Sequence, residues 1–199
     1  MREKQHMPKE YLDRIAIAKK FGYDIEKERQ LIIDMSGPLK GRILEVGTGK
    51  GYLAIALARK GHYVTSIDIS EEGIAKAKSV IKGMGLEDSI KLKVENALSM
   101  SFADQSFDSI LLVNVLHHLN SPFVVFDEII RVLAPAGKII ISDFSKKGFD
   151  VLDEIFAVEC REHSVGEFDL EDMKKYFLSK ELKTEEHNSE FQNMIIVKV

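Results

Sequence analysis

The chain has 199 residues, 45% of them hydrophobic and 30% charged, which is enough apolar mass to bury one domain-sized core and excludes intrinsic disorder. No run of about 18 uncharged apolar residues occurs, so we predict no transmembrane helix. The single cysteine, Cys160, excludes an internal disulfide or a multi-cysteine metal site, and residues 150–199 carry 13 acidic against 6 basic side chains, which disfavours nucleic acid as a partner.

The first 144 residues predict two helices followed by an alternating core. Residues 1–40 hold two short apolar stripes at helical spacing, the second of which ends at Ser36-Gly37-Pro38. From residue 41, short apolar runs alternate with helical periods, which is typical of parallel strands joined by crossover helices. We predict a core over residues 41–144 with strands at 43–46, 63–67, 90–94, 107–113 and 138–142, and helices at 52–60, 71–84 and 122–133.

The last part of the chain predicts a different arrangement. Helices are expected at 150–163 and 169–178, with Asp150 and Asp169 as N-caps, and two strands at 182–187 and 191–199 are joined by a turn. We therefore predict an α/β fold: a doubly wound sheet of seven strands, mostly parallel, with a C-terminal antiparallel hairpin. As a single domain it would comprise a helical cap over 1–40, the core over 41–144, a helical lid over 145–180 and a strand pair over 181–199.

Three glycines at alternate positions follow the first predicted strand. Gly47, Gly49 and Gly51 come where a strand turns into a helix, and glycine there lets a ligand approach the backbone. The dinucleotide fingerprint needs a glycine where Tyr52 stands, and the phosphate-binding P-loop needs Ser or Thr where Gly51 stands. Asp68 ends the second strand about 20 residues further on, where a carboxylate can accept hydrogen bonds from a ribose diol. The pattern indicates a nucleoside ligand.

This combination resembles the class I S-adenosylmethionine-dependent methyltransferases, in particular their type 11-like domain, from Gly41 to about Phe144. The resemblance implies a Rossmann-like sheet and S-adenosyl-L-methionine as the cofactor. It also implies which residues surround the cofactor: at its methionine part Glu45, Gly47, Thr48, Gly49 and Gly51, at its ribose Asp68, at its adenine Ile69, Asn96 and Ala97, and at the end of the fourth strand Asn114.

Two positions depart from the family pattern. Many relatives have aspartate where Asn96 stands, and an amide oxygen can still accept a hydrogen bond from the adenine amine. Many have Pro-Gly-Gly where this chain has Pro135-Ala136-Gly137. We expect the alanine to restrict that turn and to affect packing more than ligand binding.

The reaction that the resemblance implies needs little fixed machinery. A sulfonium methyl group is already activated, so the protein mainly has to align nucleophile, methyl and sulfur and to exclude water. A hydroxyl or ammonium nucleophile must also lose a proton, and His117 or His118 after the fourth strand is the nearest candidate base. We predict a cytoplasmic enzyme without a metal that methylates a small-molecule acceptor chosen by the cap and the lid. No motif specifies the acceptor or the oligomeric state.

Alternatives exist for several of these positions. Asp68 can cap the following helix, and Asn114 can cap the following turn. Tyr176 and Lys180 have the spacing of a reductase pair, which makes a nicotinamide-dependent reductase an alternative, although Tyr52 and the glycine spacing disfavour it. A non-catalytic module that binds S-adenosylmethionine is the other alternative.

Overall fold

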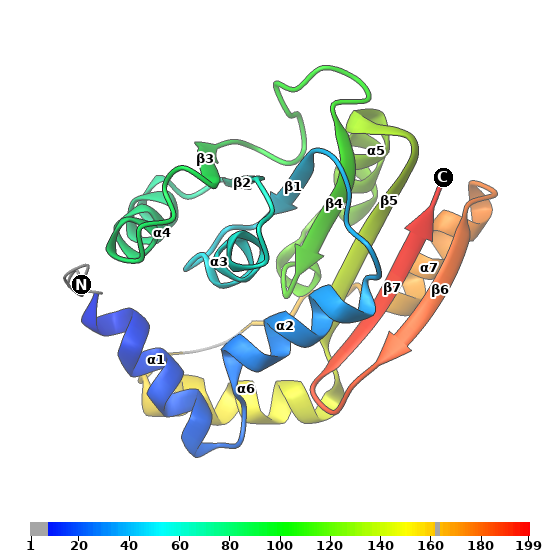
Figure 1. Cartoon of the computed structure of the whole chain (residues 1–199). Helices are drawn as coiled ribbons and strands as arrows, with labels where there is room; N and C mark the ends of the chain where they lie inside the picture. The colour runs from blue at the N-terminus through cyan, green and yellow to red at the C-terminus, as the bar shows by residue number, and fades with distance from the viewer. Residues whose placement is uncertain (1–7, 162–163) are drawn as a thin grey trace.

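The computed structural model describes residues 8–161 and 164–199 and has a seven-stranded sheet with helices on both faces (Figure 1). The strand order is β3-β2-β1-β4-β5-β7-β6, in which β7 is antiparallel to both of its neighbours and the other pairs are parallel. This confirms the predicted doubly wound sheet and its C-terminal hairpin. The elements are α1 (Lys9–Lys20), α2 (Ile25–Met35), β1 (Ile43–Val46), α3 (Tyr52–Arg59), β2 (Val64–Asp68), α4 (Glu71–Gly83), β3 (Ile90–Val94), β4 (Phe107–Val113), η1 (a 3₁₀ turn, Leu116–His118), α5 (Pro122–Val132), β5 (Leu133–Phe144), α6 (Lys146–Val158), α7 (Leu170–Ser179), β6 (Lys183–Asn188) and β7 (Gln192–Lys198).

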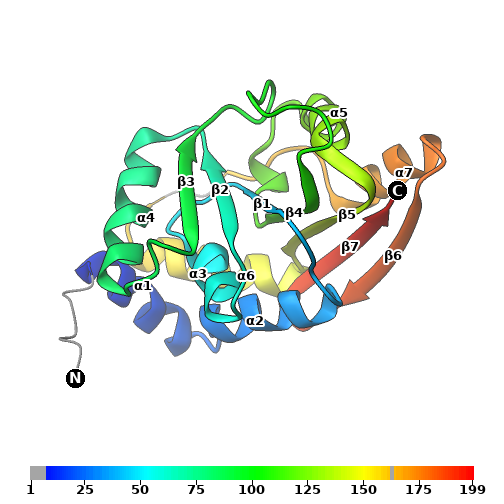
Figure 2. The ribbon, with the colours of Figure 1, turned by 45° about the horizontal axis from the view of Figure 1, so that its top comes forward.

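Alternate residues of the central strands point to opposite faces of the sheet, as a side-chain period of two requires. Ile110 and Leu112 of β4 pack in the core beneath α5 and α7, whereas Leu111 and Val113 pack beneath α2 and α3. Burial on both faces explains why β4 is a continuous apolar run in the sequence. The sheet twists strongly from β3 at one edge to β6 at the other (Figure 2).

Helices α1 and α6 lie side by side in both views and extend the core beyond the carboxyl end of β5 (Figures 1 and 2). Ala18 of α1 and Val151 and Ile155 of α6 pack together with Phe144, the last residue of β5. Arg14 of α1 forms an ion pair with Glu159, which follows α6, and both side chains are largely buried. Segments that are 145 residues apart in the sequence are therefore joined at this edge.

Three local predictions were wrong. The first lid helix begins at Lys146 instead of residue 150, because Ser145 and not Asp150 accepts the capping hydrogen bond, from the backbone of Gly148. This helix ends at Val158, before Cys160, and residues 162 and 163 of the predicted helix lie outside the described residues. The helix expected to end at residue 133 ends at 132, and the strand expected at 138–142 is longer, since β5 runs from Leu133 to Phe144 and includes the predicted turn at 135–137.

The second lid helix begins as predicted. The side chain of Asp169 accepts a hydrogen bond from the backbone N–H of Asp172, and the side chain of Asp172 accepts one from the backbone of Asp169. This reciprocal capping box satisfies two donors at the start of α7. In the part of the chain that the structure describes, no helix is long and apolar enough to cross a membrane.

Ala136→Gly should raise the free energy of unfolding by about 0.5–1 kcal/mol, because Ala136 is exposed and has a φ of 59°, in the left-handed region that disfavours a Cβ. Urea unfolding monitored by circular dichroism measures the change. Gly137→Ala is the matched opposite: its new Cβ would lie 2.7 Å from the carbonyl oxygen of Ala134, so it should destabilise. An unchanged midpoint for Ala136→Gly would contradict the strain argument.

Candidate functional site

The glycine loop after β1 is tied to the end of β2. The backbone N–H groups of Gly47 and Thr48 both donate to the carbonyl of Ile67, at 2.8 and 3.0 Å. Gly47 has a φ of 89°, and a Cβ built on it would lie 2.3 Å from the Val115 side chain. This position therefore has to be glycine. At Gly49 a Cβ would meet no atom within 4 Å, so the loop is open at this residue.

Asp68 lies beside that opening at the end of β2. One carboxylate oxygen accepts from the backbone N–H of Gly49 at 2.8 Å and the other from the backbone N–H of Ser70 at 3.0 Å. The helix cap is Ser70, whose hydroxyl accepts from Gly73, so Asp68 is not needed as the cap of α4. Each oxygen of a carboxylate has a second lone pair, so Asp68 can accept further hydrogen bonds from a ligand.

The predicted adenine-side residues follow the next strands. Ile69 is 69% exposed although it is a large apolar side chain next to Asp68. Asn96 follows β3, and its side-chain oxygen accepts from the backbone N–H of Leu98 at 3.0 Å. This bond fixes the turn that also contains Ala97 and leaves the exposed Asn96 amide at the surface of the loop.

Asn114 has both a strained backbone and an unsatisfied side chain. Its φ is 58°, and its backbone N–H donates to the carbonyl of Ser142 at 2.8 Å. The side-chain oxygen and nitrogen are both buried, and neither has a hydrogen-bond partner among the described residues. The alternative that Asn114 caps the following turn is therefore wrong. Strain together with an unpaired buried amide is typical of a ligand-binding position.

Glu45 is a buried carboxyl group within β1, at 2% exposure. Burial raises its pKa to about 8, although the hydroxyl of Ser66 donates to it. Ser66 is in turn 2.6 Å from the hydroxyl of Thr48 in the glycine loop. Glu45 is thus held mostly in its neutral form near pH 7, at the base of the loop.

Arg29 of α2 is a residue that sequence reasoning missed. Its side chain is 8% exposed and donates to the hydroxyl of Tyr23 at 3.1 Å, yet it forms no ion pair within 4 Å among residues 8–161 and 164–199. Its charge acts on Glu45, Tyr11 and Tyr52, which places it near the glycine loop. Its charge also acts on the buried carboxyl of the neighbouring Glu28. A buried guanidinium without an ion pair is costly, so it favours an anionic ligand group. Only the helical stripe around it was visible in the sequence.

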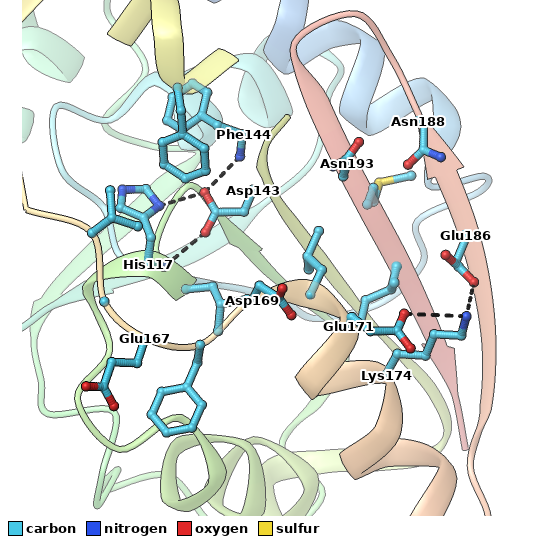
Figure 3. Close-up of a pocket in the computed structure, with 18 residues that line it drawn as sticks. His117, Asp143, Phe144, Glu167, Asp169, Glu171, Lys174, Glu186, Asn188 and Asn193 are labelled. Carbon is cyan, nitrogen blue, oxygen red and sulfur yellow. Dashed lines mark hydrogen bonds and ion pairs between the residues drawn. The ribbon is translucent and has the colours of Figure 1, made fainter. Parts of the chain in front are cut away.

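The two histidines have different positions, and Figure 3 shows His117 beside Asp143. His117 is 3% exposed, its Nδ1 lies 2.6 Å from Asp143 Oδ1, and its backbone N–H donates to Asp143 Oδ2 at 3.0 Å. Asp143, at the end of β5, is 5% exposed and was not predicted. His118 is exposed, and its ring centroid lies 4.0 Å from that of His117. His117 and Asp143, but not His118, line a cavity of about 390 Å³.

The reductase alternative loses its support in the structure. Tyr176 and Lys180 both bind the carboxylate of Asp127 on α5, at 2.6 and 2.7 Å. They therefore tie α7 to α5, on the outer surface of the sheet's helical layer. The spacing of Tyr176 and Lys180 thus lets both side chains bond one carboxylate and join two helices.

Comparison with known proteins identifies the family. Residues 44–141 match the family described as "Methyltransferase domain". This segment belongs to the class I S-adenosylmethionine-dependent methyltransferases. The chain is 35% identical over 101 residues to the phosphatidylethanolamine N-methyltransferase of Cereibacter sphaeroides, covering 51% of this chain and 49% of the relative. It is also 35% identical over 113 residues to the ubiquinone biosynthesis O-methyltransferase of Xylella fastidiosa, covering 55% and 44%.

The chain spans about half the length of these curated relatives. In fold it is similar to the crystal structure of an S-adenosylmethionine-dependent methyltransferase from Aquifex aeolicus, with a TM-score of 0.67 and 18% identity over 86% of this chain and 89% of that one. The cofactor of the family is S-adenosylmethionine, as the sequence predicted.

The raised pKa of Glu45 predicts how the stability of the protein depends on pH. Between its ordinary pKa of 4.5 and about 8, the folded state holds a proton that the unfolded state has lost, so stability contributed by this group falls as pH rises through that window. In the wild type we expect the free energy of unfolding to decline by an amount on the order of 1–4 kcal/mol between about pH 5 and 8.5 because of this group, and Glu45→Gln should remove that decline. Urea unfolding at both pH values, with exposed Glu87→Gln as the control, measures it. Equal pH dependence in wild type and Glu45→Gln would refute the assignment.

Proposed function

We propose that this chain is a methyltransferase that transfers the methyl group of S-adenosylmethionine to a small-molecule acceptor. The observation that carries the proposal is a pair of buried polar groups near the glycine loop whose bonding is incomplete among the described residues: Arg29 bonds Tyr23 but has no ion pair within 4 Å, and the Asn114 amide has no hydrogen-bond partner. Buried groups of this kind are stabilised when a ligand satisfies them, and the amino-acid end of S-adenosylmethionine offers both a carboxylate and an ammonium.

Each predicted contact has a chemical reason. Arg29 binds the cofactor's carboxylate, which supplies the missing counter-ion. Glu45 and the Gly47–Gly51 loop, with Thr48, surround its methionine part, and Asn114 completes that end. Asp68 accepts from the ribose hydroxyls with its remaining lone pairs. The exposed apolar surface of Ile69 packs on the adenine, whose edge meets Asn96 and Ala97.

His117 is the residue that we propose as the general base. When bound, S-adenosylmethionine supplies an electrophilic methyl group. Asp143 Oδ1 lies 2.6 Å from His117 Nδ1, and with Nδ1 as the donor of this bond the ring carries its basic lone pair on Nε2. Asp143 also accepts from the backbone of His117, which fixes the position of the ring. His118 is exposed and does not line the cavity that His117 lines, so it is the weaker candidate.

We propose that residues 1–40 and 145–180 cover the site and select the acceptor. The Arg14–Glu159 pair joins α1 to the end of α6, and both charges act on Lys50 of the glycine loop, which places this joint close to the loop. Together with the core over 41–144 and the strand pair over 181–199, these segments form one methyltransferase domain.

The acceptor that we propose is a small molecule, not a nucleic acid, because residues 150–199 are strongly acidic. We also propose a cytoplasmic location, since the one cysteine, Cys160, is free and exposed, which fits a reducing compartment. A module that binds the cofactor without catalysis would share the cofactor contacts but would transfer no methyl group to any acceptor.

Calorimetric titration with S-adenosylhomocysteine tests the cofactor contacts part by part. Asp68→Asn should weaken the binding of S-adenosylhomocysteine by about 1–3 kcal/mol, because one accepting oxygen is lost. It should weaken the binding of 5′-methylthioadenosine, which lacks the amino-acid end, by the same amount. Arg29→Met should weaken the binding of S-adenosylhomocysteine by a similar amount and leave the affinity for 5′-methylthioadenosine unchanged.

Asp88→Asn, the same change at an exposed loop position, is the control and should alter neither affinity. Failure of the wild-type protein to bind S-adenosylhomocysteine, or a preference for NADH, would refute the proposed function. Equal losses for both ligands in Arg29→Met would refute the role of Arg29 alone.

A further inference from the structure

We propose that the cavity beside His117 is the acceptor site and that it selects a small acceptor carrying a positive charge. This inference rests on the proposed function, since it assigns the acceptor of the same reaction. It concerns the chemical class of the acceptor, which the relatives do not determine because their printed names refer to different molecules and atoms.

The position of the cavity follows from the order of the strands. It opens at the carboxyl end of β5, where Asp143 and Phe144 line it, and at η1, which contributes Leu116 and His117. Asn114, the proposed cofactor contact, lies three residues before His117 in the same segment. A molecule in this cavity therefore contacts the proposed base and lies next to the cofactor side of the sheet.

The inner wall of the cavity is apolar. The side chains of Phe144, Phe149 and Phe168 line it together with Met194 and Ile195 of β7. The ring centroid of Phe149 lies 5.3 Å from that of His117, so an aromatic surface adjoins the dyad. A volume of about 390 Å³ is within the range of small-molecule sites. The wall thus fits the carbon skeleton of a small acceptor and leaves its polar end to the rim.

The rim carries an excess of carboxylates (Figure 3). Glu167, Asp169 and Glu171 lie on the segment that leads into α7, and Glu186 faces them from β6. Lys174 is the one lysine or arginine that lines the cavity among the described residues, and it is already paired with both Glu186 and Glu171.

This imbalance decides the charge of the acceptor. With Asp143, five carboxylates line the cavity against one ammonium, so a cation is attracted and an anion repelled. In Figure 3 the buried His117–Asp143 pair lies on one side of the cavity, Glu171 and Glu186 lie on the other, and Glu167 lies on the same side as His117. The acceptor is thus expected to present its hydroxyl or amine to His117 and a separate ammonium group to the rim.

A charge-matched pair of probes tests the proposal with the full chain saturated in S-adenosylhomocysteine. Tyramine and 3-(4-hydroxyphenyl)propanoate share a phenol ring and a two-carbon arm but end in an ammonium and a carboxylate. Calorimetry should show tyramine binding at least about 10-fold more tightly, the effect expected of complementary charge. Equal binding of the two probes, tighter binding of the propanoate, or binding of neither would overturn the proposal.

Variants locate the binding and identify its cause. Glu167→Gln combined with Glu186→Gln should weaken the binding of tyramine by about 3- to 10-fold. Glu72→Gln on α4, which removes a carboxylate far from the cavity, should leave this affinity unchanged. Val165→Trp, at an exposed residue of the cavity lining, should block tyramine without changing the affinity for S-adenosylhomocysteine. Tyramine binding that survives Val165→Trp refutes this cavity as the site. Failure of the wild-type protein to bind S-adenosylhomocysteine would refute the proposed function as well as this proposal.

Discussion

The site depends on the close contact between the turn after β1 and the segment after β4. These strands are parallel neighbours, so their carboxyl ends meet at one edge of the sheet. Gly47 allows the contact, because a Cβ there would overlap the side chain of Val115. The same contact places the loop that follows Glu45 next to Asn114. Without it, the glycine loop and the segment that carries the proposed base would be separated.

Burial of the polar groups around this contact costs free energy, because these groups lose their hydration. Glu45 is mostly neutral, Arg29 has no counter-ion within 4 Å in the described part of the chain, and the Asn114 amide has no partner there. The apolar layers on the two faces of the sheet supply the stability that such a site requires. A ligand that carries a carboxylate and an ammonium offsets these costs, so binding and stability are coupled here.

The register of the central strands also arranges the proposed base. Val113 of β4 lies opposite Ser142 of β5, and the chain continues from these two residues to His117 and Asp143. The bond between His117 and Asp143 therefore spans 26 residues of sequence but only one strand spacing. The cavity then extends from this dyad towards α7 and β6, so one wall is apolar and the rim is acidic.

Local patterns in the sequence determined much of the fold. The apolar alternation of the strands, the glycine loop and the position of Asp68 depend on neighbouring residues, so these features were predicted correctly. The start of α6 was predicted wrongly because Ser145 and Asp150 are both good caps, and the packing of α6 on Phe144 and α1 is non-local. The pairing of His117 with Asp143 and the burial of Arg29 beside the glycine loop were decided only by the tertiary structure. Both arise because sheet register and helix packing bring together residues that have no local relation in the chain.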